Sequence, residues 1–269
     1  MSRQGWFGRR AFLALSLSCL VAPLREGWSQ VETRRATYQA RTSLLYGVLK
    51  FEVGGTIDES VDQGRRRYQV QIAGQGPEMQ NRIESSGVLH DGRWTPHRTS
   101  TRFVVYGRES WSEVAYDHAR RTIEYHSRSE TFLLRRLRLA DDVLPMHDGV
   151  HVDDVVSATL NYAESRWAHD ADATLRTHVV RRRRSAGEGP DDVEKAYRAE
   201  LVPFTLRVQA DPQTGKTTAV FDLTRFSSWA RESEPARIVF GPDRRPESIT
   251  ATLILGTAVA IQLGPAAAA

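Results

Sequence analysis

Apolar and polar residues alternate along most of the chain. Tyr68, Val70 and Ile72 are separated by Gln69 and Gln71, which is the two-residue period of a strand with one buried face. The same period recurs in residues 49–53, 175–179, 204–208, 219–223 and 249–255. Short alternating segments at this spacing predict an antiparallel sheet that curls or closes on itself.

Turn-forming residues separate the alternating segments, as at Asp91-Gly92 and Asp148-Gly149. The stretch ADPQTGKT, residues 210–217, resembles the end of a nucleotide-binding P-loop, but Ala210 stands where that motif has its first glycine. It also lies between two alternating segments, whereas a P-loop leads from a strand into a helix. We therefore predict a hairpin loop here and no nucleotide site.

One segment follows a helical period instead. Apolar residues recur at i, i+4, i+7 and i+11 from Val156 to Trp167, and Asp153 or Asp154 can cap the start of such a helix. The predicted fold class is therefore mainly β. We expect a single curled antiparallel sheet or partial barrel with one packed α-helix at about residues 154–168.

Residues 1–29 have the form of an export signal. A positive segment that ends in Arg9-Arg10 precedes an apolar stretch too short to span a bilayer comfortably, and Ser29 completes a cleavage site that would leave Gln30 first. The paired arginines also fit the twin-arginine pattern, so the general and the twin-arginine routes both stay open. The segment predicts an exported protein, periplasmic or otherwise in the cell envelope.

Charge and cysteine content narrow the chemistry further. The chain has 37 Lys and Arg against 33 Asp and Glu, and the leader holds four of the arginines and one of the acids, which leaves 33 against 32. This balance argues against a nucleic-acid partner. Cys19 is the only cysteine, so without the leader the chain has no thiol chemistry; lipidation at Cys19 is an alternative fate for the leader. No later apolar run is long enough for a transmembrane helix.

Three blocks of sequence carry a family resemblance. They are YQARTSLLYGVLKFEVGGTI (38–57), PMHDGVHVDDVVSATLNYAE (145–164) and PARIVFGPDRRPESITATLILGTAVAIQL (235–263). Together they resemble a bacterial family of exported proteins known as domain of unknown function 3108. The resemblance implies an antiparallel β domain in the periplasm or outer envelope, with no assigned reaction. We expect one domain over residues 31–264 and a disordered tail over 265–269.

The stretch HDGVHVDD, residues 147–154, is the best cluster of potential metal ligands. His147, His151 and Asp153 combine imidazole and carboxylate groups, which suit zinc or manganese. A turn at Gly149 and a capping role for the aspartates explain the same residues without a metal. No cofactor is therefore predicted, and a metal-dependent hydrolase that uses these three residues is kept as the alternative function.

Four consecutive arginines, Arg181–Arg184, precede a polar loop at residues 185–192. They could bind phosphate or an acidic polymer, or contact a partner, but alternate residues of a strand point to opposite faces. We favour a solvated strand end that discourages edge pairing. The chain has no Gly-x-Ser-x-Gly motif, and Ser157 at the helix start has an ordinary structural explanation. The favoured function is non-enzymatic: the concave face of the sheet holds a lipid-like or polymeric ligand, or a partner protein.

Overall fold

The computed structural model describes residues 31–268 except 45, 47–48, 132, 171, 173, 186, 190, 195, 228–229, 232, 255–256 and 265–266. Arg9, Arg10, Cys19, Ser29 and Gln30, on which the export prediction rests, lie outside the described residues, and so does Leu255. The strands are β1 (Val31–Leu44), β2 (Leu49–Asp62), β3 (Arg67–Gln75), β4 (Met79–His90), β5 (Arg93–Val105), β6 (Arg108–Asp117), β7 (Thr122–Glu130), β8 (Leu137–Pro145), β9 (Thr174–Arg182), β10 (Ala199–Ala210), β11 (Thr217–Phe221), β12 (Ala236–Phe240), β13 (Pro246–Thr252), β14 (Ala258–Leu263) and β15 (Ala267–Ala268).

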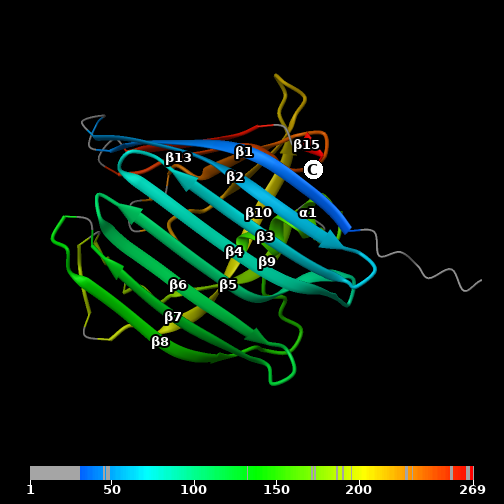
Figure 1. Cartoon of the computed structure of the whole chain (residues 1–269), viewed down its shortest axis with the longest axis horizontal. Coiled ribbons are helices and arrows are strands. Elements are labelled where there is room, and N and C mark those ends of the chain that lie inside the picture. Colours follow the sequence, from blue (N-terminus) through cyan, green and yellow to red (C-terminus); the bar gives the residue numbers. More distant parts are fainter. Residues whose placement is uncertain are drawn as a thin grey trace, which may run out of the picture.

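These strands form one antiparallel sheet in the order β8-β7-β6-β5-β4-β3-β2-β1-β14-β13-β12-β11-β10-β9. In Figure 1, β1 to β8 form the near wall, while β9 and β10 run behind it at a steep angle. The sheet comes close to closing between its two edge strands. A bridge joins Ala140 of β8 to Tyr197, and His178 of β9 exchanges backbone hydrogen bonds of 2.9 Å with His151 and Asp153. The predicted fold class, a curled antiparallel sheet or partial barrel, is confirmed.

The single helix of the described residues, α1 (Val155–Ala163), packs between the two walls. Val156 and Leu160 pack against β2 to β5 in a cluster that includes the fully buried Trp94. Ala158 and Tyr162 pack against β10 to β12 on the other side. Apolar burial on two faces of one short helix accounts for its stability inside the sheet. With nine residues, α1 is too short to cross a membrane. The described part of the chain has no helix that is long and apolar enough to do so.

The helix ends five residues earlier than the sequence predicts. Ser165 has a φ of 57°, and Arg166 donates its backbone N–H to Asn161 across 2.8 Å, which closes the last turn. Trp167 is buried all the same, because the chain folds back and its indole donates to the carbonyl of Arg176 at 2.9 Å. The apolar period therefore continued beyond the end of the helix and made the prediction too long.

The P-loop-like stretch is the turn between β10 and β11, as predicted. Asp211 and Lys216 close the loop with a 2.8 Å backbone hydrogen bond, and Gly215 has a φ of 68°. The Asp211 carboxylate accepts the backbone N–H groups of Gln213 and Thr214. Ala267–Ala268 (β15) pair with β1. The other residues of the expected disordered tail over 265–269 lie outside the described residues.

Two glycines allow a tyrosine to lie across neighbouring strands. Tyr38 of β1 points to the concave side and reaches β4, where its hydroxyl donates to Asn81 Oδ1 at 2.5 Å. A Cβ on Gly55 would lie 2.6 Å from the Tyr38 ring, and one on Gly74 would lie 2.0 Å from its hydroxyl oxygen. Both positions therefore require glycine for steric reasons.

Candidate functional site

A pocket of about 160 Å³ lies between α1 and the concave face of the sheet. Strands from both ends of the sequence contribute its wall, because β1 pairs with β14. Its apolar wall is formed by Ala36, Ile57, Val70, Ile72, Ile249 and Leu263, and α1 contributes Val155, Val156, Thr159 and Leu160. The pocket is thus an apolar space closed on one side by the helix.

Strand alternation explains why this space is apolar. Ile57 stands at the same parity as the buried Phe51 and Val53 of β2, so all three point to the concave side. On the helix, Val155 lies at the pocket yet remains 61% exposed. The hydroxyl of Thr159 donates to the carbonyl of Val155 at 2.7 Å and so offers the pocket little polarity. An apolar wall with an exposed valine is a surface that a ligand can cover.

The rim of the pocket carries two ion pairs. Both terminal N–H groups of Arg245 donate hydrogen bonds to the Glu59 carboxylate, at 2.7 and 2.6 Å. The guanidinium of Arg34 pairs with the carboxylate of Asp243 at 2.7 Å. Burial raises the pKa of Glu59, and the two arginines oppose that rise. Two cations and two anions leave the rim balanced in charge. This arrangement suits an apolar group inside the pocket and a polar, overall neutral group at its edge.

A buried hydrogen-bond network fixes the start of α1. Asp154 caps the helix by accepting the backbone N–H of Ser157 at 2.6 Å, and its other oxygen accepts the hydroxyls of Ser85 and Thr99. The cap residue predicted from the sequence is therefore confirmed as Asp154. Because Ser85 is on β4 and Thr99 on β5, the cap also joins the helix to the near wall.

Asn161, fully buried on α1, makes a second connection to β5. Its side-chain oxygen accepts the backbone N–H of Trp94 at 2.7 Å, and its amide donates to the carbonyl of Trp94 at 2.8 Å. Pairing between β5 and β6 begins only at Arg98, so the Asn161 amide takes the place of a strand partner at Trp94. The helix, and with it one wall of the pocket, is held at a defined position.

The structure places His147, His151 and Asp153 in different surroundings. Asp153 is buried and accepts from Arg93 at 2.6 Å and from Thr177 at 2.5 Å. His151 is exposed, and partial burial with the nearby Arg93 lowers its pKa. His147 lines a separate groove of about 270 Å³. Among the described residues, no group of three or more His, Cys, Asp or Glu side chains could hold a metal ion.

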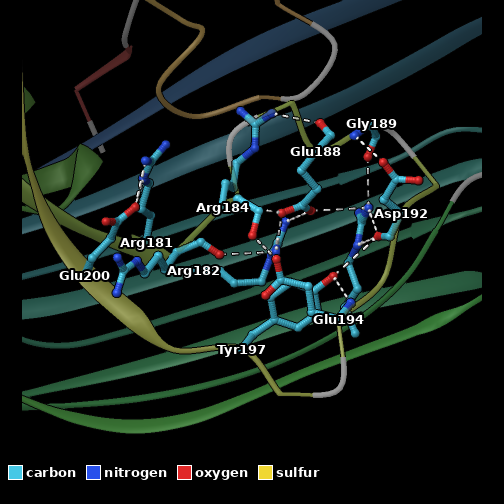
Figure 2. Close-up of polar contacts among 12 residues, drawn as sticks. Arg181, Arg182, Arg184, Glu188, Gly189, Asp192, Glu194, Tyr197 and Glu200 are labelled. Carbon is cyan, nitrogen blue, oxygen red and sulfur yellow. Dashed lines mark hydrogen bonds and ion pairs between the residues drawn. The ribbon is translucent and has the colours of Figure 1, made fainter.

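The arginine run is not the solvated strand end that the sequence suggested. Arg182 donates to the buried Glu188 carboxylate at 2.6 and 3.1 Å, and its guanidinium lies 4.1 Å from the centre of the Tyr197 ring (Figure 2). Arg181 pairs with Glu200 at 2.7 Å, and Arg184 donates to a backbone carbonyl at 2.8 Å. The prediction of solvated side chains was wrong for these three arginines, because the loop after β9 folds back and supplies Glu188 as a partner. Arg183 is exposed, and β9 is an edge strand of the sheet.

Sequence reasoning missed the charged residues of the pocket rim. Glu59 did carry a signal, since it stands between Ile57 and Val61 at the parity of the buried face. A carboxylate at such a position needs a partner. Arg245 follows the turn after β12 and carried no comparable signal, because only the fold brings it to β2.

No family model matches the chain, and no curated protein matches it. Among solved structures, a β-barrel-like protein of domain of unknown function DUF1849 from Brucella abortus matches with 10% identity and a TM-score of 0.42, over 90% of this chain and 99% of that chain. A putative outer membrane lipoprotein-sorting protein domain from Vibrio parahaemolyticus matches with 9% identity and a TM-score of 0.22, over 90% and 86%. Both scores are too low to support a functional argument.

Proposed function

We propose that the protein is a non-enzymatic binding module that holds the apolar part of a lipid-like ligand between α1 and the concave face of the sheet. The observation that carries this proposal is the apolar pocket of about 160 Å³ with the 61% exposed Val155 at its side. Pockets for whole drug-sized ligands measure roughly 300–1,000 Å³. This pocket therefore suits one end of an acyl chain or a small apolar group.

The rim chemistry supports a ligand with a polar, overall neutral end. The Arg245–Glu59 pair is bidentate and only 18% and 10% exposed, so its charges satisfy each other before any ligand binds. A strongly anionic group would have to displace Glu59 or Asp243. A polymeric ligand or a partner protein has less support, because the pocket is small and bounded by the helix.

Filling the pocket tests this proposal. Thr159→Phe places a ring in the pocket from the helix, whereas Thr250→Phe places the same ring on an exposed position of β13, next to the pocket residue Ile249. Binding of a fluorescent fatty-acid analogue should be lost in Thr159→Phe and kept in Thr250→Phe. Absence of binding by the unaltered protein, or equal binding by both variants, would refute the proposal.

We further propose that residues 1–29 direct export to the cell envelope and that cleavage leaves Gln30 first. The support is the sequence of the leader, with Arg9-Arg10 before an apolar stretch and Ser29 at the cleavage site. N-terminal sequencing of the exported protein tests the cleavage site. Replacing both arginines by lysine separates the routes, because only the twin-arginine route needs the guanidinium pair. We also propose that the chain belongs to the bacterial family known as domain of unknown function 3108, on the basis of the three sequence blocks that resemble it.

A further inference from the structure

The two ends of the near wall differ in the residues they expose. Because consecutive strands are antiparallel, the turns after β1, β3, β5 and β7 all lie at one end of the sheet, on the left in Figure 1. We call this the leucine end. The turns at the opposite end, residues 63–66, 91–92 and 118–121, contain only polar residues, glycine and alanine.

Large apolar side chains are exposed at the leucine end. Leu133 and Leu134 in the turn before β8 are 56% and 59% exposed, and Leu139 on β8 is 54% exposed. Tyr46, after β1, is 78% exposed, and Tyr106, in the turn after β5, is 40% exposed. Apolar side chains gathered on one end of a molecule indicate an interaction surface.

The turn that carries Leu133 and Leu134 is held in place by hydrogen bonds to the loop after β9. The Asp191 carboxylate accepts the backbone N–H groups of Leu133 and Leu134, at 2.9 and 2.7 Å. Arg138, from the same hairpin, donates to the carbonyl of Asp192 at 2.6 Å. The backbone of the turn is therefore attached to the loop after β9, and its exposed leucines are presented on a fixed support.

Arginines surround the exposed leucines. Arg135 and Arg136 follow them directly, and Arg128 of β7 stands opposite Leu139 in the strand register. Arg135 pairs with Glu130 at 3.1 Å, whereas Arg128 and Arg136 form no ion pair with any residue that the structure describes. Exposed leucines beside available guanidinium groups match the two layers of a membrane surface, where acyl chains lie beneath phosphates.

We propose that the leucine end docks on the surface of a bilayer that contains anionic phospholipid. Leu133 and Leu134 enter the acyl boundary, and Arg128 and Arg136 contact lipid phosphates. Tyr46 and Tyr106 lie at the depth of the headgroups, where an aromatic ring with a polar tip is favoured. This docking surface involves none of the pocket residues and does not depend on the pocket being occupied.

The exposed leucines of the edge strand β8 could instead meet a second copy of the chain. The charges favour the bilayer, because two copies joined through this end would bring Arg128 and Arg136 of one copy, which form no ion pair within the described residues, close to the same arginines of the other. An anionic lipid surface supplies the opposite charge over a wide area.

Co-sedimentation with vesicles tests the proposal. The full chain without its leader should bind vesicles of phosphatidylglycerol and phosphatidylcholine, and bind pure phosphatidylcholine much less. Leu133→Ser with Leu134→Ser should weaken binding at least about tenfold, because two apolar side chains no longer leave water. Arg128→Gln with Arg136→Gln should weaken it about fivefold per arginine, and added salt should weaken it as well.

Val143→Ser is the matched control, since Val143 is a 59% exposed apolar residue of β8, the strand that follows Leu133 and Leu134, and lies near the far end of that strand. It should bind vesicles like the unaltered protein, and circular dichroism should show that all variants are folded. The proposal is overturned if the unaltered protein ignores phosphatidylglycerol vesicles or if the leucine variant binds as well as Val143→Ser. Concentration-dependent dimers that disappear in the leucine variant, without vesicle binding, would assign the surface to a second copy.

Discussion

Replacing Asn161 by alanine should detach α1 from the near wall and destabilise the whole fold. Asn161 is fully buried and joins the helix to β5 through the N–H and C=O of Trp94, at 2.7 and 2.8 Å. It also donates to the Asp153 carboxylate at 3.0 Å. Alanine removes all three hydrogen bonds. Because the site is fully buried, water does not replace the lost partner.

The magnitude follows from those contacts. A buried polar group left without a partner costs about 1–3 kcal/mol, and the two backbone groups of Trp94 both lose theirs. The Asp153 carboxylate keeps the hydroxyl of Ser157 at 3.1 Å, so its loss is smaller. Alanine returns roughly 0.5 kcal/mol through its higher helix propensity. We expect a net loss of about 3–5 kcal/mol, which corresponds to roughly 6–20 °C in Tm for a chain of this size.

Urea unfolding followed by circular dichroism measures the effect. Thr159→Ala is the control on the same helix, because that hydroxyl reaches only the carbonyl of Val155, and it should change the free energy of unfolding by less than about 1 kcal/mol. The reasoning is refuted if Asn161→Ala costs no more than Thr159→Ala. In that case apolar packing alone would position the helix.

Three further predictions concern other parts of the fold. Gly74→Ala should lower the free energy of unfolding by more than about 2 kcal/mol in urea titrations, while Gly54→Ala, whose Cβ would meet nothing closer than 3.9 Å, should cost less than half as much. Arg245→Met alone should cost about 3–5 kcal/mol, and adding Glu59→Gln should restore much of it, because the single change leaves a buried carboxylate without its partner; equal losses in both would contradict this. Burial raises the pKa of Glu188, but its arginine partners outweigh burial and lower the pKa below the ordinary value of 4.5. The stability it contributes is therefore present above about pH 4.5 and lost as pH falls through the lowered pKa, so Glu188→Gln should destabilise at pH 7 and converge with the unaltered protein in acid, as thermal melts across pH would show.

Local patterns predicted strands at β2, β3, β9, β10, β11 and β13, the turn at residues 211–216 and the capping of α1. These features depend on neighbours in the sequence: parity along a strand, glycine and proline in a turn, and a carboxylate before a helix. The arginine run and the pocket rim were missed because their partners are distant along the chain. Arg245 and Glu59 are brought together only when β1 pairs with β14 and the turn after β12 reaches β2. A buried-parity acid such as Glu59 predicts that a partner exists, but not which residue it is.

The pairing of β1 with β14 has a consequence for how the protein folds. Strands β1 to β8 and strands β9 to β14 can each form from consecutive hairpins, but the contact between Tyr38 and Leu263 joins residues more than 200 positions apart. Closing so long a loop carries an entropic cost that must be met before the contact stabilises anything, and folds dominated by such pairings fold slowly. The concave faces of both meanders stay open until β14 pairs with β1, so the chain should depend on protection from aggregation while it is being synthesised.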